Sequence, residues 1–321
     1  MRETEKKIKT QLVQRHQKPD IPAIKINLYN ALEVRAVKQA IDKLKGHHGF
    51  STPDCIMVGD SLLTTHLGKE STRLTTIEEQ DSFVDLMLES IEKVKCAIIE
   101  LFLKEERPYL MGDLPDGTSA SKQRLINISG KMLDHGADIV KLEIISKSDL
   151  TLIEFLVENN IPVAAHIGYA PQKNNNRKYG QTLQEALELI EIVRLAGDCG
   201  ASVIILERID EVINQILCAP SKAGLPIFSI FSGKAAGGGQ SLNIWDSVYK
   251  PGFQSHFFPP TSRYSPDTYP DSYTQNTIAN CFYNLLKLTL DREFPKSPST
   301  SLSLEDIEYL KSIGPWTNKI I

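Results

Sequence analysis

Ionisable side chains follow five of the short apolar runs in this 321-residue sequence. A single carboxylate in such a position usually caps a helix or lies on the surface. Five such positions in one chain instead favour a shared site that combines acids with bases. In chain order the side chains are Asp60 with its neighbour Ser61, Asp113, Lys141 with Glu143, His166 and Glu207.

Three of these residues, Asp60, Asp113 and Glu143, offer carboxylate oxygens, and no cluster of cysteines or histidines competes with them. Hard oxygen ligands suit Mg²⁺, which takes one or two carboxylates and keeps several waters. Lys141 lies two residues before Glu143, so both side chains face the same side of a strand. The two residues either form a plain ion pair, or Lys141 binds an anionic substrate beside the metal.

The elements that must position these side chains alternate regularly along the chain. Short apolar runs of strand length are separated by segments with helical spacing, which indicates repeated βα units and a parallel sheet. Seven or eight units fit between residues 22 and 250, so we predict an α/β fold of the (β/α)8 TIM-barrel type. No G-x-G-x-x-G follows the first run, which disfavours a dinucleotide-binding sheet. We expect strands at 23–29, 55–58, 109–111, 138–142, 161–165, 202–206 and 225–231.

The ends of the chain differ from this alternating region. Residues 1–21 are highly polar and are expected to form an arm, whereas residues 22–250 form the barrel. Residues 251–321 are predicted as a loop followed by a helical extension, with a helix at 277–290 and another opened by Ser303 and Asp306 in a capping box. The glycine run at 237–239 lacks the spacing of a phosphate-binding loop, so a flexible loop at the rim is expected.

Composition narrows the classes of partner. Lys and Arg total 36 and Asp and Glu total 40, for a net charge of −4, which makes nucleic acid an unexpected partner. No apolar run approaches the ~20 residues of a membrane span, and residues 1–19 lack the apolar core of a secretory signal. Five scattered cysteines fit a reducing compartment, so a cytoplasmic location is expected.

Five motifs in order carry a resemblance to a known family. They are VGDSL at 58–62, GDLP at 112–115, VKLE at 140–143, AHIGYAPQ at 165–172 and ILE at 205–207. This ordered set resembles the ketopantoate hydroxymethyltransferase (3-methyl-2-oxobutanoate hydroxymethyltransferase) family. That family has a (β/α)8 barrel of the phosphoenolpyruvate/pyruvate-binding type. The resemblance spans about residues 22–245 and continues faintly into 286–295.

The resemblance implies transfer of a hydroxymethyl group from 5,10-methylenetetrahydrofolate to 3-methyl-2-oxobutanoate with Mg²⁺, giving 2-dehydropantoate for pantothenate and coenzyme A synthesis. It also implies a homo-oligomer. Asp60 and Asp113 would be metal ligands, and Glu143 would reach the metal directly or through water. Ser61, Lys141 and His166 would bind the oxoacid, and Glu207 would be the general base.

The implied chemistry is physically consistent with these residue types. A 2-oxoacid chelates Mg²⁺ through its carboxylate and keto oxygens, and the metal stabilises the enolate that forms when the adjacent carbon loses a proton. A positioned carboxylate that removes this proton contributes about 10²–10⁴-fold to the rate. Burial beside the apolar residues 204–206 would raise the pKa of Glu207 toward the range that suits a base.

The sequence departs from the family pattern around the pocket. Ile144 and Ile145 stand where the family has two glycines, and Phe231 replaces a glycine after the seventh strand. The aspartate of the following D-G-Q is also missing. The chain is therefore a divergent ketopantoate synthase, or a paralogue that condenses or cleaves another 2-oxoacid. A further alternative is a barrel that binds ligands without catalysis.

Overall fold

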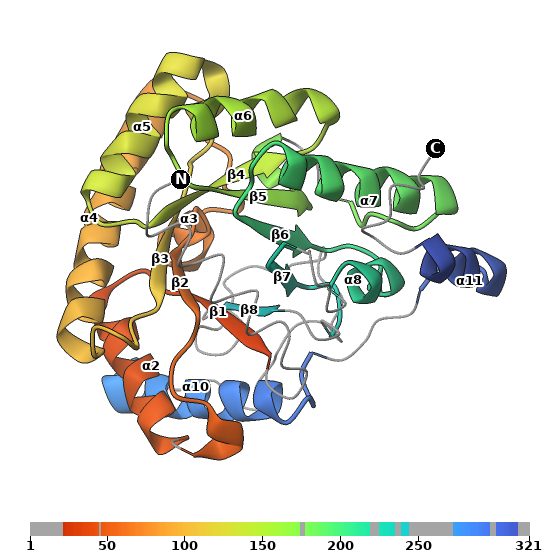
Figure 1. Cartoon of the computed structure of the whole chain (residues 1–321). Coiled ribbons are helices and arrows are strands. Elements are labelled where there is room, and N and C mark those ends of the chain that lie inside the picture. Colours follow the sequence, from red (N-terminus) through yellow and green to blue (C-terminus); the bar gives the residue numbers. More distant parts are fainter. Residues whose placement is uncertain are drawn as a thin grey trace.

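Eight parallel strands form a closed barrel surrounded by helices (Figure 1). The computed structural model describes residues 22–44, 46–173, 177–218, 225–234, 239–243, 272–295 and 300–313. Each strand pairs with the next one along the chain, and β1 pairs with β8 to close the barrel. The strands are β1 (Ala23–Asn27), β2 (Cys55–Val58), β3 (Tyr109–Asp113), β4 (Ile139–Ile144), β5 (Val163–Gly168), β6 (Val203–Glu207), β7 (Ile227–Ile230) and β8 (Gly239–Asn243).

The helices of the outer ring begin where the sequence supplies caps. Thr76 forms a capping box with Glu79 at the start of the longest helix, and the Ser121 side chain accepts from the Arg124 amide. The α-helices are α2 (Ala31–Lys43), α3 (Leu62–Thr65), α4 (Ile77–Leu101), α5 (Lys122–Asp134), α6 (Leu150–Glu158), α7 (Leu183–Asp198), α8 (Glu211–Leu217), α10 (Gln275–Leu290) and α11 (Leu304–Ile313). Short 3-10 turns are η1 (His47–Gly49), η2 (Thr118–Ala120), η3 (Lys147–Asp149) and η4 (Pro171–Lys173). The predicted TIM barrel is confirmed.

The alternation of side chains along each strand divides the core into two parts. On β1, Ile24 and Ile26 pack toward the helices, while Ala23 joins a small apolar cluster inside the barrel. Lys25 and Asn27 also face inward and line a cavity toward the carboxyl ends of the strands. The barrel interior is therefore apolar at one end and polar at the other.

The last strand was not expected from the sequence. The glycine run at 237–239 is predicted as a loop, but Gly239 is the first residue of β8. A Cβ atom on Gly239 would lie 2.4 Å from the Phe228 ring of β7, so only glycine lets the two strands approach. Gly237 and Gly238 lie outside the described residues, as do the predicted arm at 1–21 and the predicted loop at 251–271.

Helix α10, from the region predicted as a C-terminal extension, packs along α2 (Figure 1). Its buried face includes Ile278, Phe282 and Leu286, and Asn276 and Asn280 accept hydrogen bonds from Gln39 and Lys43 of α2. The capping box predicted at Ser303 is present at the start of α11, where the Asp306 amide donates to the Ser303 hydroxyl at 3.1 Å. The C-terminal region thus contributes to the helical layer.

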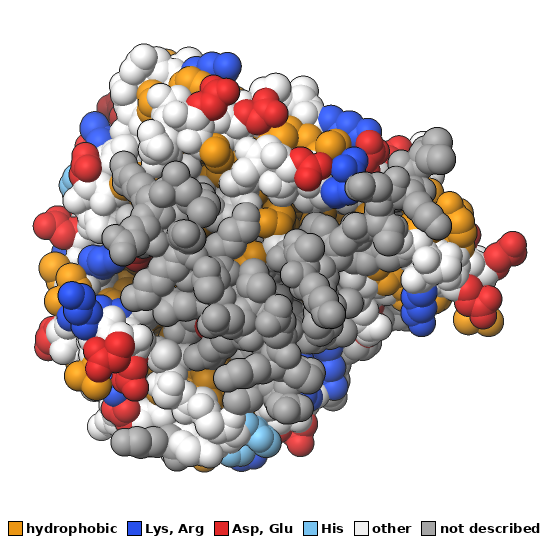
Figure 2. All heavy atoms as spheres, in the orientation of Figure 1, with side chains coloured by type: hydrophobic (Ala, Val, Ile, Leu, Met, Phe, Trp, Pro, Cys, Tyr) orange, Lys and Arg blue, Asp and Glu red, His pale blue; other side chains and the backbone are white. Residues whose placement is uncertain are grey.

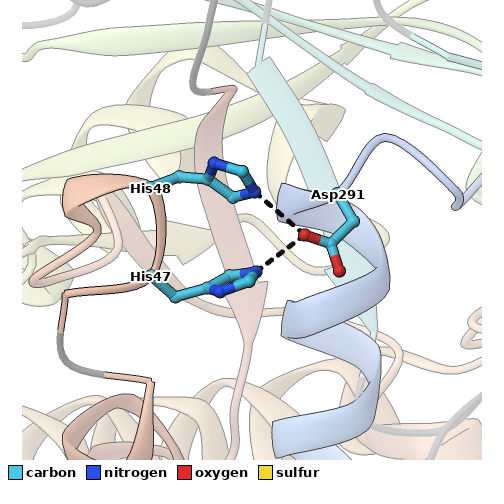
Figure 3. Close-up of side chains that lie close together, drawn as sticks. All are labelled: His47, His48 and Asp291. Atoms are coloured by element: carbon cyan, nitrogen blue, oxygen red, sulfur yellow. Dashed lines mark hydrogen bonds and ion pairs between the residues drawn. The ribbon is translucent and has the colours of Figure 1, made fainter.

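Two histidines hold the end of α10 against η1 (Figure 3). Nε2 of His47 and Nε2 of His48 lie 2.7 and 2.9 Å from Oδ1 of Asp291, the residue that caps α10. The other carboxylate oxygen accepts from Lys287 at 2.7 Å. His48 has a left-handed backbone (φ 48°), which brings both rings to the same oxygen.

The outer surface carries charges of both signs. In the view of Figure 2, acidic and basic side chains of the described helices are interspersed around the rim of the molecule. None of the described helices is both long and apolar enough to cross a membrane.

We predict that Asp291→Asn lowers the melting temperature by weakening the attachment of α10. The contacts with Lys287, His48 and His47 lower the pKa of Asp291, so its stabilising effect is complete above its usual pKa and disappears as the pH falls through the lowered value. The difference in melting temperature between wild type and Asp291→Asn should therefore be largest near pH 7 and should shrink below about pH 4.

The matched control is Glu89→Gln, which neutralises an exposed carboxylate paired with Lys93 on α4. Exposed pairs of this kind contribute little to stability, so this variant should melt like the wild type. Equal melting temperatures for wild type and Asp291→Asn at pH 7 would contradict the prediction.

Candidate functional site at the mouth of the barrel

The seven residues singled out from the sequence line one cavity at the carboxyl ends of the strands. They come from β3, β4, β5 and β6 and from the turn that follows β2. Strand register aligns Asp113 with Lys141 and Glu143 with His166. Because inward-facing residues on neighbouring parallel strands meet at the same level, distant parts of the sequence converge here. The residues are Asp60, Ser61, Asp113, Lys141, Glu143, His166 and Glu207.

Lys141 and Asp113 form a buried ion pair across β3 and β4. Nζ of Lys141 lies 2.6 Å from Oδ2 of Asp113, and both side chains are almost fully buried. The Asp60 amide also donates to Oδ2 of Asp113, at 3.1 Å. Burial acts to lower the pKa of Lys141, but the carboxylates of Asp113, Asp60 and Glu143 outweigh it and raise the pKa, so the ammonium stays charged.

Two carboxylate oxygens in the cavity lack hydrogen-bond partners. Among the described residues, neither Oδ1 of Asp113 nor Oε2 of Glu143 has a partner, although both atoms are buried. Burial raises the pKa of Asp113 to about 7 and that of Glu143 well above its ordinary value. Buried, unpartnered carboxylate oxygens normally require a cation or a proton.

These carboxylates fit a divalent cation with hard-oxygen preference. Asp60 lies beside them, and its Oδ2 accepts from Nε2 of Gln172 at 2.7 Å. Within the described part of the chain, only His47, His48 and Asp291 bring three donor atoms within 4.8 Å of one another. A cation held by Asp60, Asp113 and Glu143 would thus contact one or two of them directly and keep water or substrate ligands, as Mg²⁺ prefers.

His166 and Glu207 form a second pair on β5 and β6. Nε2 of His166 lies 3.1 Å from Oε2 of Glu207, whereas its Nδ1 is 3.9 Å from Glu143. Burial lowers the pKa of His166 well below its usual value, so the ring is neutral and donates from Nε2. Burial also raises the pKa of Glu207 to about 7, although 17% of its side chain is exposed to the cavity. A carboxylate with this pKa can accept a proton near neutral pH.

Ser61 is held by a residue that the sequence did not suggest. Its hydroxyl lies 2.7 Å from the hydroxyl of Tyr29, which follows β1 and is buried. Ser61 immediately precedes the short helix α3 and lines the cavity. Tyr29 thus fixes the orientation of the Ser61 hydroxyl. The hydroxyl of Thr65 lies 3.5 Å from the same tyrosine oxygen.

Other residues support or line the cavity, and one of them, Phe231, was already noted in the sequence as a departure from the family pattern. Gln172 ends the AHIGYAPQ motif, and it joins Asp60 to the Leu114 carbonyl, to which it donates at 3.1 Å. Phe231 lines the cavity with a left-handed backbone (φ 53°), the conformation for which glycine is suited, and so occupies space that a glycine would leave open. Polar residues of β1 and β8 complete the cavity: Lys25, Asn27, Ser241 and Asn243. The sequence did hold a signal for two of them: Lys25 and Asn27 are polar residues two positions apart within an apolar run.

We predict that Lys141→Met destabilises the metal-free protein by about 3 kcal/mol, because Asp113 loses the cation that offsets its burial. Urea unfolding at pH 8 measures this change. The double variant Lys141→Met/Asp113→Asn should recover most of the lost stability, since it leaves no unpaired charge. A double variant as unstable as the single one would show that the ion pair is not the cause.

Comparison with known proteins identifies the family to which the chain is similar. Residues 40–263 match the family model of ketopantoate hydroxymethyltransferase. The chain is 29% identical over 211 residues to the 3-methyl-2-oxobutanoate hydroxymethyltransferase of Kosmotoga olearia, covering 64% of this chain and 71% of that protein. It is 31% identical over 200 residues to the enzyme of that name from Thermotoga maritima, covering 61% and 67%.

Solved structures support the fold. Oxaloacetate acetylhydrolase in complex with 3,3-difluorooxalacetate superposes with a TM-score of 0.50 at 15% identity, covering 74% of this chain and 79% of that one. A putative lyase/mutase from Burkholderia cenocepacia J2315 gives 0.50 at 13% identity, covering 75% and 82%. The family match spans most of the barrel and includes seven of its eight strands, β2 to β8. The chain therefore belongs to the ketopantoate hydroxymethyltransferase family of enzymes.

Proposed function

We propose that the chain enolises a 2-oxoacid and transfers a hydroxymethyl group to its C3 carbon, with 5,10-methylenetetrahydrofolate as donor and Mg²⁺ as cofactor. The acceptor named in the family is 3-methyl-2-oxobutanoate, whose product is 2-dehydropantoate. The observation that carries the proposal is the cavity in which the Lys141–Asp113 pair and the His166–Glu207 pair face the same space. In this proposal the barrel region, residues 22–250, supplies every site residue. We also propose that the chain assembles as a homo-oligomer.

Binding of the oxoacid would use the cations and donors on one side of the cavity. Lys141 keeps its positive charge, and Ser61 presents a hydroxyl held by Tyr29, so both can bind the substrate carboxylate. Asp60, Asp113 and Glu143 would hold the Mg²⁺, which when bound supplies Lewis-acid stabilisation of negative charge on the keto oxygen.

Proton transfer would belong to Glu207. Its pKa of about 7 is near the value that is best for a base at neutral pH. The His166 ring holds Oε2 by donating from Nε2, and this contact orients the carboxylate without adding a charge. Glu207 would take the C3 proton, after which the nucleophilic carbon attacks the methylene carbon of the donor. Water would supply the hydroxyl oxygen, and tetrahydrofolate would be the leaving group.

We predict that the wild type with Mg²⁺ exchanges the C3 proton of 3-methyl-2-oxobutanoate in D₂O without folate, as measured by proton NMR. Glu207→Gln should slow exchange by about 10²–10⁴-fold, because the base is lost. In Asp113→Asn, adding Mg²⁺ should no longer increase the exchange rate, because a metal ligand is lost. Glu188→Gln, an exposed change of the same type on α7, is the matched control and should exchange at the wild-type rate. Exchange that persists in Glu207→Gln would contradict the assignment of the base.

The rate of exchange should also depend on pH in a defined direction. Glu207 must be ionised to accept a proton, so the rate should rise about tenfold per pH unit below pH 7 and level off above it. Exchange rates measured from pH 5 to 9 test this profile. A rate that is still rising steeply above pH 8 would indicate a different base.

Phe231 favours a second candidate function within the same chemistry. Its ring occupies part of the cavity beside Ile230 and Glu207 at a position with glycine-like backbone geometry. A pocket reshaped in this way would suit condensation or cleavage of a 2-oxoacid other than 3-methyl-2-oxobutanoate. In the exchange assay, a panel of 2-oxoacids distinguishes this candidate, because another acid would then exchange faster.

A further inference from the structure

The cavity contains a second buried lysine that the proposed reaction does not use. Lys25 lies in the middle of β1, is 1% exposed and lines the same cavity as Lys141. Its Nζ donates to Oδ1 of Asn27 at 2.6 Å. Within the described residues, no carboxylate lies within ion-pair distance of this ammonium, unlike Lys141 with its bond to Asp113.

The two carboxylates that act on Lys25 electrostatically, Asp113 and Glu207, have other hydrogen-bond partners. Asp113 holds Lys141, and Glu207 accepts from His166. Burial lowers the pKa of Lys25 to about 8, as expected for an ammonium that lacks sufficient compensation from its surroundings. A buried cation whose one partner is a neutral amide is unfavourable unless a ligand supplies an anion.

Lys25 belongs to a polar wall formed by two neighbouring strands. Strand register pairs Lys25 of β1 with Ser241 of β8, and Asn27 with Asn243. All four side chains are buried, with exposures of 1%, 2%, 5% and 8% respectively. The hydroxyl of Ser241 has no hydrogen-bond partner among the described residues. The wall therefore offers an ammonium and a hydroxyl side by side, with the Asn27 amide next to them.

The polar wall lies where the end of a bound oxoacid farthest from its first carboxylate would reach. Around the barrel, β8 and β1 lie between β6, which carries Glu207, and β2, which precedes Asp60 and Ser61. An oxoacid with its carboxylate at Ser61 and Lys141 and its C3 carbon at Glu207 would extend its chain along this arc. An aliphatic end would leave buried donors unpaired, whereas a carboxylate would satisfy them.

We propose that the polar wall binds a second carboxylate on the substrate, so that the chain acts on a dicarboxylic 2-oxoacid and Lys25 determines this specificity. This inference rests on the proposed function in its second form, a 2-oxoacid other than 3-methyl-2-oxobutanoate, since it takes the same cavity as a 2-oxoacid site. Lys25 and Ser241 donate to the distal carboxylate, while Asn27 holds the ammonium in place.

The test compares two five-carbon acids that differ only at the distal end, 2-oxoglutarate and 2-oxopentanoate. Calorimetric titration of the full chain with Mg²⁺ should show that the wild type binds 2-oxoglutarate at least tenfold more tightly, as expected for a charge-assisted hydrogen bond. In Lys25→Met the ratio should fall to about one, with 2-oxopentanoate binding retained. Lys38→Met, on the outer helix α2, removes the same charge and should keep the wild-type ratio.

The wild-type ratio needs no variant, so it decides the inference even if Lys25→Met folds poorly. Folding is checked by thermal melting, where loss of an unpaired buried charge should leave the variant at least as stable as the wild type. Equal or tighter binding of 2-oxopentanoate by the wild type overturns the inference while leaving the proposed function standing. If neither acid binds and no proton exchange occurs, the proposed function fails and the inference falls with it. A 2-oxoglutarate adduct trapped on Lys25 by borohydride would also overturn it, since the amine would then react covalently.

Discussion

A buried ammonium and a buried carboxylate, joined at 2.6 Å across β3 and β4, organise the mouth of this barrel. Lys141 keeps one oxygen of Asp113 occupied, and the Asp60 amide reinforces that contact from the turn after β2. The other oxygen of Asp113 is buried and has no hydrogen-bond partner among the described residues. Such a pair brings little net stability, because removing both charges from water offsets their attraction. Its value lies in presenting a permanent cation and an available carboxylate oxygen side by side.

The second pair is tuned differently, although it lies only two strands away. Glu207 has a neutral hydrogen-bond partner, His166, and the positive charges of Lys141, Lys25 and Arg208 offset its burial only in part. Burial raises its pKa to about 7, and the carboxylate can exchange protons near neutrality. Burial raises the pKa of Asp113 to about 7 as well, so the two carboxylates differ in their partners: Asp113 contacts an ammonium and Glu207 a neutral ring.

Much of the fold and the site could be predicted from the sequence because the relevant signals are local. Seven strands were predicted from the apolar runs. Most of their predicted ends lie within two residues of the observed ends, and both ends of β2 agree. All seven predicted site residues line one cavity, because the parallel register of a closed barrel brings strand ends together. Their chemical roles stay predictions.

Other features depend on contacts that no local pattern carries. Strand β8 begins at Gly239, and the Phe228 ring on the neighbouring strand β7 explains why a glycine is needed there. The bond between Gln172 and Asp60 joins residues 112 positions apart. Lys25 sits in an apolar run and is significant only because Ser241 lies beside it in the closed barrel. In each case the missing information is tertiary.

We propose that the carboxylates at the barrel mouth hold a divalent cation to which the 2-oxoacid binds. Electron paramagnetic resonance of Mn²⁺, titrated with and without 3-methyl-2-oxobutanoate, tests it most directly. We expect one bound Mn²⁺ per chain. The oxoacid should tighten its binding, Asp113→Asn should abolish the binding, and Asp291→Asn should retain it. Binding that survives Asp113→Asn and disappears in Asp291→Asn would place the metal at the His47–His48–Asp291 cluster and contradict the account.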